Sequence, residues 1–435
     1  MAERKLFGTD GVRGVAGEVL TASLALQLGR AATDELGAAS LLVLRDTRRS
    51  GPMLESALAA GAASSGAAVV SGGVLPTPAA PLLLVRHGIE LAAVISASHN
   101  PYADNGIKFF GPDGHKLDDE VEARIEARLR ADHGTGRHHG GVTRLLGAGE
   151  DYLRVLAERF EGLDLAGMKV ALDCANGATY KVAPEIFRRL GADVTAVAVV
   201  PDGENINDNC GSTHLGPLSA LMKEGAHDIG FAFDGDGDRV LAVDRDGHVV
   251  DGDELIALIA RHLHRTGELG GGVSVTVMTN FGFHRAMAES GIEVDITGVG
   301  DRYVLESLRD RKWRLGGEQS GHIIDLGFCP SGDGIASALL VLEALAGADL
   351  RERDGMTKMP QLLVNVPVPD RDAALQDEDV LAARDTVAAE LGGDGRILLR
   401  ASGTEQLVRV MVEAPSAELA TALCERVASR VRALA

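Results

Sequence analysis

Short apolar runs alternate with helix-like stretches rich in Ala, Leu, Glu and Arg along most of the 435-residue chain. Such alternation is typical of βαβ units and a mainly parallel sheet, which narrows the available folds sharply. A chain of this length also exceeds what one hydrophobic core can hold, so several domains are expected. The apolar runs fall into three groups of three: 41–51, 67–78 and 91–100; 169–180, 193–207 and 228–239; 273–284, 292–303 and 313–322.

This grouping predicts one α/β module used three times. From about residue 360 the pattern changes to a strand, a helical stretch through Leu391, a strand pair, and a final helix capped by Ser416. One side of that helix is expected to be buried through Leu419, Leu423, Val427 and Val431. We therefore predict three similar α/β domains with mixed, mainly parallel sheets and a smaller C-terminal α+β domain, with boundaries at 1–149, 150–248, 249–359 and 360–435.

Composition narrows the functional classes. The formal net charge of -20 argues against general nucleic-acid binding, which relies on basic patches. No run approaches the roughly 20 apolar residues that span a bilayer, and the first residues lack the apolar core of a signal peptide. The four cysteines are scattered without a C-x-x-C pair, which fits a reducing compartment. We expect a cytoplasmic protein with no membrane or nucleic-acid partner, whose cores rely on Ala, Val and Leu because only 3% of residues are aromatic.

Open parallel sheets bind ligands at the carboxyl ends of their strands. The loops that follow the third run of each group are therefore the first candidates for a shared site. They contain the stretches "SASHN", "DGDGDR" and "GEQSGH".

The stretch "DGDGDR" carries Asp234, Asp236 and Asp238 directly after the apolar run "IGFAF". Carboxylates this close repel each other unless a cation or hydrogen bonds compensate, and the intervening glycines let the backbone curl toward one point. Oxygen ligands of this kind suit Mg²⁺, which usually shares them with a phosphate. A calcium-binding EF-hand would need Gly and Glu where Arg239 and Arg245 stand, so that interpretation fails. A solvated acidic turn stays open as the alternative.

Ser98 ends a buried-looking run and is followed by His99. The Asn100-Pro101 pair favours an extended backbone and helps to hold the loop. No G-x-S-x-G elbow is present, which disfavours an acyl-transfer hydrolase. A serine that faces a metal is better suited to carrying phosphate, because phosphoserine brings a charge of about -1.5 to -2 that Mg²⁺ partly neutralises. A plain capping or turn role is the structural alternative.

Two further loops carry chemistry. The stretch "GGEQSGH" places Glu318, Ser320 and His322 at alternate positions, where Glu and Ser suit sugar hydroxyls and the histidine suits acid–base work. In "LRASGTEQLVRV", Arg400 and Arg409 bracket a turn whose hydroxyls and backbone N–H groups can face phosphate oxygens. A hairpin turn with surface arginines is the alternative for the second stretch.

Together, "SASHNP", "DGDGDR", "GEQSGH" and "RASGTE" resemble the four signature loops of the α-D-phosphohexomutase superfamily. Other stretches, among them "FGTDGVRG", "RDTRRSG", "GENINDNCGSTH" and "VGDRYVLE", are similar to its bacterial phosphoglucosamine mutase branch. The resemblance runs from about Lys5 to the C-terminus. It implies four domains arranged as a heart around a central cleft, each supplying one loop, and it suggests a homodimer.

The resemblance also implies an activity. Such an enzyme is an isomerase that interconverts glucosamine 6-phosphate and glucosamine 1-phosphate, with glucosamine 1,6-bisphosphate as intermediate and activator, on the route to UDP-N-acetylglucosamine and the cell wall. Ser98 would be the phosphorylated serine, and it would hold one Mg²⁺ per subunit together with Asp234, Asp236 and Asp238.

The resemblance implies further roles for the remaining loop residues. Arg13, Lys108 and His322 match positions linked to proton transfer and charge stabilisation, and Arg239 matches one that orients the active loop. Sugar hydroxyls would be bound by Glu318 and Ser320. The non-reacting phosphate would be held by Arg400, Ser402, Gly403, Thr404 and Arg409.

Three alternatives compete with this function. A sister mutase for glucose or mannose phosphates usually has Met where Gln319 follows Glu318, so Gln319 favours the amino sugar. A haloacid-dehalogenase-like enzyme with Asp234 as nucleophile would need Thr or Val where Asp238 stands. A non-enzymatic metal-binding scaffold leaves the serine loop and the two arginines without explanation.

Overall fold

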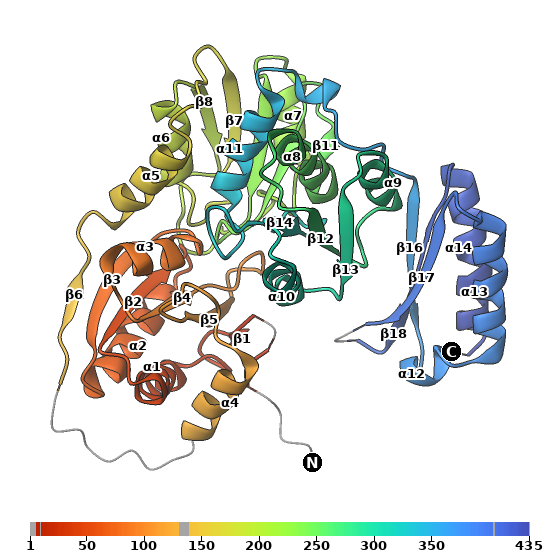
Figure 1. The fold of residues 1–435 in the computed structure, drawn as a ribbon. Coiled ribbons are helices and arrows are strands. Elements are labelled where there is room, and N and C mark those ends of the chain that lie inside the picture. The colour runs from red at the N-terminus through yellow and green to blue at the C-terminus, as the bar shows by residue number, and fades with distance from the viewer. Residues whose placement is uncertain (1–5, 9, 130–138, 403–404, 435) are drawn as a thin grey trace. The chain divides into compact units, whose positions relative to one another are not determined.

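The structure, a computed structural model, describes residues 6–8, 10–129, 139–402 and 405–434. The chain forms two compact units, of which the first spans 1–278 with 292–355 and the second spans 279–291 with 356–435. Three of the sheets belong to the first unit and follow one another along the chain, and the fourth belongs to the second unit (Figure 1).

The first sheet is built around three parallel strands. β2 (Ser40–Arg45) lies between β3 (Ala68–Val74) and β4 (Leu91–Ile95), and β5 (Asp104–Phe110) pairs with β4 in the antiparallel direction. Two edge strands and four helices complete this part of the chain: β1 (Val12–Val15), β6 (Val142–Arg144), α1 (Ala22–Leu36), α2 (Gly51–Ser64), α3 (Ala79–His87) and α4 (Asp119–Arg128).

The second sheet repeats this order. β7 (Lys169–Asp173) lies between its parallel neighbours β8 (Asp193–Val197) and β9 (Ile229–Phe233), and β10 (Val240–Val243) runs antiparallel beside β9. The other elements of this part are β11 (Val249–Val250), α5 (Ala148–Arg159), α6 (Val182–Arg189) and α7 (Gly216–Lys223).

The third sheet has the same order again. β12 (Gly272–Thr276) lies between the parallel strands β13 (Glu293–Thr297) and β14 (Leu315–Gly317), and β15 (Ile323–Asp325) runs antiparallel beside β14. The helices of this part are α8 (Gly252–Thr266), α10 (Asp301–Arg311), α11 (Gly334–Leu345) and the short 3₁₀ helix η1 (Leu350–Glu352).

The shared order confirms the prediction of three similar α/β modules with mixed, mainly parallel sheets. It also explains why three signature loops lie at equivalent places. In each module the third parallel strand passes through a polar loop into an antiparallel fourth strand, as β4 does into β5, β9 into β10 and β14 into β15. The fourth strands were not predicted, because each directly follows a polar loop, and β10 and β15 are also short.

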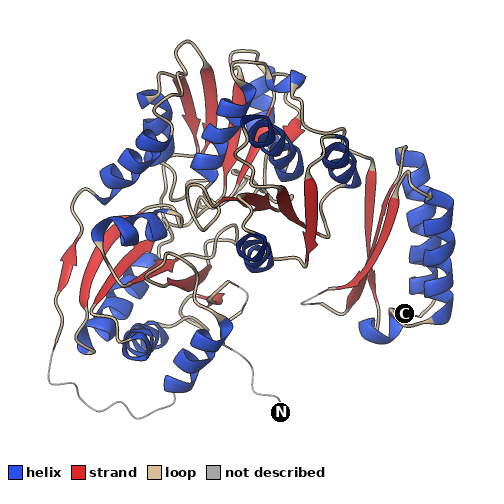
Figure 2. Ribbon diagram, viewed as in Figure 1, coloured by secondary structure: helices blue, strands red, loops and turns tan. Residues whose placement is uncertain are grey.

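The second unit confirms the predicted α+β domain. The central strand β18 (Leu407–Glu413) pairs antiparallel with β16 (Gln361–Pro367) and β17 (Arg396–Ala401). One face of this sheet is covered by α13 (Glu378–Leu391) and α14 (Ala417–Arg432) (Figure 2). The unit also includes α9 (Phe281–Glu289) and α12 (Arg371–Ala374).

The final helix matches its prediction except at one position. The Ser416 hydroxyl accepts a hydrogen bond from the Leu419 N–H at 3.2 Å, which confirms the cap. Leu423, Val427 and Val431 are buried, but Leu419 is 42% exposed, so the predicted stripe is wrong there. Ala420 takes the buried place in the first turn, because it lies three residues before Leu423 on the same helix face.

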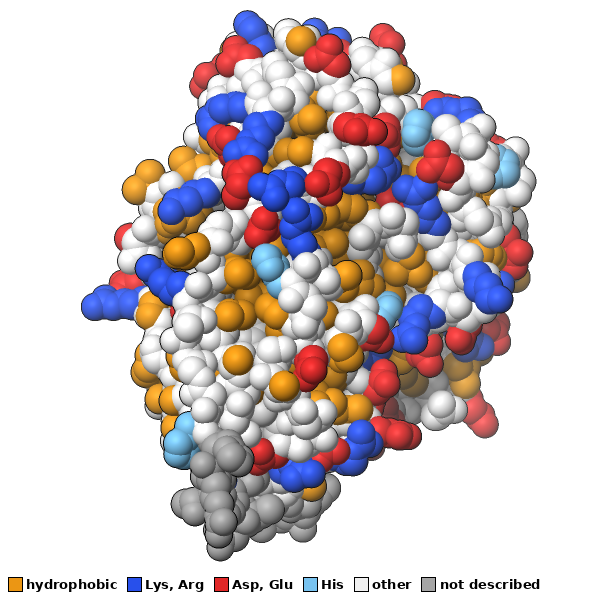
Figure 3. Space-filling view, turned by 60° about the vertical axis from the view of Figure 1, so that its left-hand side comes forward, with side chains coloured by type: hydrophobic (Ala, Val, Ile, Leu, Met, Phe, Trp, Pro, Cys, Tyr) orange, Lys and Arg blue, Asp and Glu red, His pale blue; other side chains and the backbone are white. Residues whose placement is uncertain are grey.

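Small aliphatic residues dominate the cores, as the low aromatic content predicts, with Ala, Val and Leu most frequent around the first and last sheets. Within the described residues, no helix is both long and apolar enough to cross a bilayer. On the face shown in Figure 3, basic and acidic side chains are interspersed rather than sorted by sign.

Candidate active site

Ser98 is buried, with only 1% of its surface exposed, in the loop between β4 and β5. Its backbone is left-handed (φ 51°), and its Oγ donates a hydrogen bond to Asp234 Oδ2 at 2.5 Å. The Nδ1 atom of His99 lies 3.3 Å from the same Oγ. Burial, and then the charges of Arg239 and Arg13, lower the pKa of His99 to about 4, so the ring is neutral near pH 7. The serine therefore faces the aspartate loop of the second sheet beside a neutral imidazole.

The three aspartates of that loop form one buried cluster. Asp234, Asp236 and Asp238 each place a carboxylate oxygen within 4.8 Å of the others. Burial, with the charges of Asp238 and Asp236, raises the pKa of Asp234 well above its usual range. Burial alone would also raise the pKa of Asp238, but Lys108 and His322 outweigh it and hold that pKa low. Within the cluster, Asp234 therefore binds a proton more readily than an ordinary carboxyl group.

The donor set of the cluster fits a divalent cation. Among the described residues, Asp236 Oδ1 and Asp238 Oδ1 are buried without a hydrogen-bond partner. Orphaned carboxylate oxygens are costly in a protein interior, and hard oxygen donors are the ligands that Mg²⁺ prefers. Gly235 allows the loops to approach, because a Cβ atom there would lie 2.7 Å from the Ser98 carbonyl oxygen. These residues therefore fit a metal ion held between the serine loop and the aspartate loop.

Two buried lysines link the cluster to the N-terminal turn. Lys108 Nζ lies 2.9 Å from Asp236 Oδ2 and 3.4 Å from Asp10 Oδ2. Lys116 Nζ lies 2.6 Å from Asp10 Oδ1 and 2.5 Å from Asp301 Oδ2. Burial would lower the pKa of both ammonium groups, but their carboxylate neighbours, Asp10 first, raise it. Both lysines therefore remain charged.

His322 closes this arrangement into a ring. Its Nδ1 lies 3.7 Å from Asp238 Oδ2, and its Nε2 lies 3.8 Å from Asp301 Oδ2. Burial would lower the pKa of His322, but the two aspartates outweigh it and raise the pKa. The Gly332 N–H donates to Nε2 at 3.3 Å, so a single ring proton stands on Nδ1, toward Asp238. Acidic and basic side chains alternate around the ring: Lys108, Asp10, Lys116, Asp301, His322 and Asp238. His322 is the neutral member of the ring when only its Nδ1 carries a proton.

Two predicted arginines flank the same centre. Arg13 on β1 donates to Asp10 and pairs across the strands with Gly106 of β5. The Arg239 backbone N–H donates to Asp234 Oδ1 at 3.2 Å, and its Nε lies 3.7 Å from Asp238 Oδ1. Arg239 Nε has no hydrogen-bond partner within the described part of the chain. The structure thus brings both arginines to the serine and aspartate loops.

The third loop presents polar groups with spare bonding capacity. Glu318 Oε1 accepts a hydrogen bond from the Gly300 N–H at 3.1 Å, which fixes the carboxylate. Ser320 Oγ is buried and, among the described residues, has no hydrogen-bond partner. Gln319, which the sequence marks as favouring an amino sugar, turns its Nε2 to Asp253 Oδ2 on α8 at 3.2 Å. Its amide is therefore occupied within the protein.

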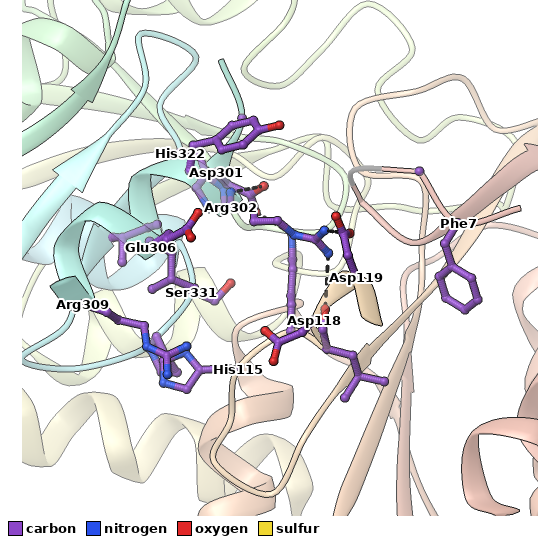
Figure 4. Close-up of a pocket in the computed structure, with 18 of the residues that line it drawn as sticks. Phe7, His115, Asp118, Asp119, Asp301, Arg302, Glu306, Arg309, His322 and Ser331 are labelled. Atoms are coloured by element: carbon purple, nitrogen blue, oxygen red, sulfur yellow. Dashed lines mark hydrogen bonds and ion pairs between the residues drawn. The ribbon is translucent and has the colours of Figure 1, made fainter. Parts of the chain in front are cut away.

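A cavity of about 840 Å³ borders this centre between the segment before α4 and the start of α10. His322 and Asp301 lie together on one wall in Figure 4. Arg302 reaches across to Asp119, and its guanidinium also donates to the Leu117 carbonyl at 3.3 Å. The cavity is wide enough for a small polar ligand and reaches the charged ring through His322.

The fourth predicted loop belongs to the second unit. Arg400 and Arg409 stand directly opposite each other on β17 and β18, and both Nε atoms are buried without a hydrogen-bond partner among the described residues. Burial, and then Arg409, lower the pKa of Arg400. Ser402 is buried. Gly403 and Thr404 lie outside the described residues.

Several residues of the charged ring have no predicted role. Asp10 and Asp301 lie in stretches that the sequence shows to be distinctive, "FGTDGVRG" and "VGDRYVLE", and Lys116 lies in the segment between β5 and α4. Their common signal is a charged side chain close to the end of a strand or the start of a helix. That signal is weak by itself, because such positions are usually solvated.

Family models match the chain over most of its length. Their descriptions are phosphoglucomutase/phosphomannomutase alpha/beta/alpha domains I, II and III, at residues 4–134, 150–247 and 251–362, and the C-terminal domain at 363–430. A phosphoglucosamine mutase of Bacillus cereus is 47% identical over 442 residues, covering 99% of this chain and 98% of that protein. One of Bacillus anthracis matches to the same extent. The chain belongs to the phosphoglucosamine mutase family.

Solved structures agree with membership of this family. A phosphoglucomutase/phosphomannomutase family protein from Burkholderia thailandensis is 26% identical, with a TM-score of 0.85 over 100% of this chain and 98% of that one. The Aspergillus fumigatus N-acetylphosphoglucosamine mutase, solved with GlcNAc-6P and magnesium, is 20% identical with a TM-score of 0.69 over 99% of this chain and 96% of its own. The second likeness shows the fold. Phosphoglucosamine mutases are isomerases, so the chain is an enzyme of that class.

Proposed function

We propose that Ser98 is the phosphoryl carrier of this mutase, which interconverts glucosamine 6-phosphate and glucosamine 1-phosphate. The supporting observation is the 2.5 Å hydrogen bond from Ser98 Oγ to Asp234 Oδ2, which sets the hydroxyl at the buried aspartate cluster. A phosphoryl group on Ser98 would bring a charge of about -1.5 to -2 into this site. Lys108 and Arg239 lie beside the same aspartate cluster and would supply compensating positive charge.

Two transfers complete the reaction. In the first, the anomeric hydroxyl of glucosamine 6-phosphate attacks phosphorus, the bond from phosphorus to Ser98 Oγ breaks, and the hydroxyl proton passes to a base. The product is glucosamine 1,6-bisphosphate, which must turn over in the site. In the second, the Ser98 hydroxyl attacks the 6-phosphate and gives its proton to a base, and the bond from phosphorus to the sugar O6 breaks. In each transfer the departing oxygen, Ser98 Oγ in the first and O6 in the second, takes up a proton. Glucosamine 1-phosphate then leaves and phosphoserine is restored. Positioning and charge stabilisation supply most of the catalysis in such transfers.

Asp234, Asp236 and Asp238, with an oxygen on Ser98, would hold one Mg²⁺ per subunit. The orphaned oxygens of the cluster support this assignment. When bound, the ion neutralises part of the charge on the transferring group.

The charged ring would serve the proton transfers. Lys108 and Arg13 would stabilise the transferring phosphoryl group, and Arg239 would orient the serine and aspartate loops. His322 would accept or return the hydroxyl proton, since its raised pKa keeps it near the range that general acid–base catalysis needs. The His322 ring lines the cavity beside Asp301, which gives it access to a bound ligand.

Substrate binding would be divided between two loops. Glu318 and Ser320 would hold sugar hydroxyls, supported by the unpartnered Ser320 Oγ. The non-reacting phosphate would be held by Arg400, Ser402, Gly403, Thr404 and Arg409. A sister activity on glucose or mannose phosphates is the second candidate, because Gln319 bonds to Asp253 rather than pointing a spare amide at a ligand.

The molecular organisation is also part of the proposal. We assign the domains to 1–149, 150–248, 249–359 and 360–435, and we infer a homodimer, which sedimentation velocity would test. We place the enzyme in the cytoplasm, where thiols stay reduced, and the four cysteines are all unpaired.

Replacing the carrier serine tests the proposal. Peptide mapping of purified enzyme should find phosphate on Ser98, and Ser98→Ala should lose most of the mutase activity while Ser56→Ala, at an exposed helix position, keeps it. Phosphate on Asp234, or full activity in Ser98→Ala, would refute the phosphoserine mechanism. Comparing glucosamine, glucose and mannose 6-phosphates as substrates would decide between the sister activities.

A further inference from the structure

Two side chains from different sheets bind the same pair of carbonyl oxygens in the serine loop. Arg48 Nη2 donates to the Ser98 carbonyl at 3.1 Å and to the Asn100 carbonyl at 2.6 Å. Asn207 Nδ2 donates to the same two oxygens, at 3.0 and 3.2 Å. Each carbonyl therefore accepts two hydrogen bonds, one from the first module and one from the second. We call these two side chains, Arg48 and Asn207, the carbonyl clamp.

Arg48 is held rigidly behind the loop. It is completely buried, and its Nη1 pairs with Asp46 Oδ2 and lies 3.4 Å from Ser96 Oγ. Ser96 Oγ in turn donates to Asp46 and accepts a hydrogen bond from the Ser98 N–H at 3.0 Å. The planar guanidinium fork suits several acceptors at fixed positions, whereas a lysine offers one point charge. Arg48 therefore binds the Ser98 segment at its carbonyl and, through Ser96, at its N–H.

Asn207 approaches from the second module with a fixed backbone. It is left-handed (φ 58°), which asparagine tolerates better than most residues, and its N–H donates to the Ala175 carbonyl at 2.9 Å. A Cβ atom on Gly235 would lie 2.7 Å from both Asn207 Nδ2 and the Ser98 carbonyl. The clamp thus sits directly against the aspartate loop that Ser98 faces.

We propose that Arg48 and Asn207 are positioning residues for phosphoryl transfer, which hold the strained Ser98 backbone at the aspartate loop. The inference rests on the proposed role of Ser98 as phosphoryl carrier. A left-handed conformation at a non-glycine residue is unfavourable, so it persists only where neighbouring contacts determine it. A displacement of the reacting group by about 1 Å can reduce a rate by about 100-fold.

The sharpest test replaces Asn207 by its isostere. Asn207→Asp keeps the size and the left-handed preference but turns a donor into a charged acceptor facing two carbonyls. Asn209→Asp is the matched control, because Asn209 is also left-handed (φ 53°) and is exposed. In single-turnover transfer from phosphorylated enzyme, Asn207→Asp should be slower by about 10- to 100-fold. KM for the sugar phosphate should stay within about threefold, because the clamp touches no predicted substrate-binding residue.

A second variant tests Arg48, the member of the carbonyl clamp that comes from the first module. Arg48→Lys should also slow the transfer, and the loss in the double variant should be smaller than the product of the two single losses, because both side chains hold the same carbonyls. Rates of both single variants equal to that of Asn209→Asp would overturn the proposal. A loss that merely follows the folded fraction, measured by thermal unfolding, would overturn it too. If Ser98→Ala kept activity, the carrier assignment would fail; if Ser98→Ala were inactive and both clamp variants were normal, only the clamp would fail.

Discussion

Arg400 lies directly opposite Arg409 on the antiparallel strands β17 and β18. Like charges in this register destabilise a strand pair unless an anion lies between or beside them. Both Nε atoms are buried without a hydrogen-bond partner among the described residues, and Ser402 follows on the same turn. This arrangement is what we expect of a pair that binds the non-reacting phosphate and that destabilises the strand pair when no anion is bound.

Neutralising either arginine of this pair should weaken substrate binding without lowering the stability of the protein. We expect Arg400→Gln and Arg409→Gln to raise KM for both glucosamine phosphates by about 10- to 100-fold, since charge-assisted hydrogen bonds contribute about 1.5–3 kcal/mol each. The ligand-free protein should keep its unfolding free energy or gain a few tenths of a kcal/mol, roughly the cost of a like-charge pair. Steady-state kinetics and urea unfolding measure the two effects. Arg426→Gln, on an exposed part of the same unit, serves as control, and an unchanged KM in the first two variants would contradict the prediction.

Replacing an aspartate of the cluster should raise the stability of the metal-free protein but lower the stabilisation that Mg²⁺ provides. The charged form of Asp234 is disfavoured in the folded protein, because burial, Asp238 and Asp236 all raise its pKa. Asp234→Asn should therefore stabilise the metal-free protein, because it removes a carboxyl group whose charged form is disfavoured in the folded state. The same change should reduce the stabilisation by Mg²⁺, which for the wild type is about 2.7 kcal/mol at 100 times the dissociation constant. Thermal unfolding of the wild type and Asp234→Asn, each with and without MgCl₂, measures both effects. A wild-type Mg²⁺ response in Asp234→Asn, or the same loss in the exposed control Asp246→Asn, would count against the site.

Asp333 should make stability depend on pH. It is buried at the start of α11, where the Tyr152 hydroxyl donates to both of its oxygens at 3.0 and 2.9 Å. Burial raises the pKa of Asp333 to about 6. Because the folded pKa exceeds the unfolded one, the folded state binds the proton more tightly. The resulting stabilisation is fully present below about pH 4 and is lost as the pH rises through 6, about 3 kcal/mol in all.

Asp333→Asn removes this titration while keeping the cap and an acceptor for Tyr152. Urea unfolding at several pH values between 4.5 and 7.5 should show the wild type losing stability relative to Asp333→Asn as the pH rises. The difference should level off above pH 7. Parallel stability curves for the two proteins across this range would show that the carboxyl titrates alike in both states.

Periodicity and turn chemistry predicted most of the fold. The nine apolar runs mark β2, β3 and β4 and their counterparts in the other two modules, because a buried parallel strand must be apolar on both faces. The Ser416 cap was equally visible, since an N-cap hydroxyl acts within one helical turn. Of the fourth strands, β15 has three residues and β10 has four, which are too few for periodicity to be recognised. The seven-residue β5 begins with the polar residues Asp104 and Asn105, so its first half resembles a loop.

Local motifs also marked the parts of the candidate site that lie in one loop. Asp234, Asp236 and Asp238 form a cluster because alternate spacing and glycines bring them together within six residues. The charged ring could not be predicted in the same way. Asp10, Lys116 and Asp301 lie far apart along the chain, and each alone looks like a solvated charge.

Sequence by itself therefore determined the three α/β modules, the final α+β domain, and the residue types that each signature loop offers, because these depend on spacing within one element or turn. Only the tertiary structure decided which side chains those loops meet. It placed Ser98 against Asp234, closed the ring from Lys108 to His322, and set Arg48 and Asn207 on the same carbonyls. These contacts join residues that lie 50 or more positions apart in the sequence, most of them in different modules. They depend on how the loops pack in three dimensions, and hydrophobic periodicity within one element carries no information about that packing.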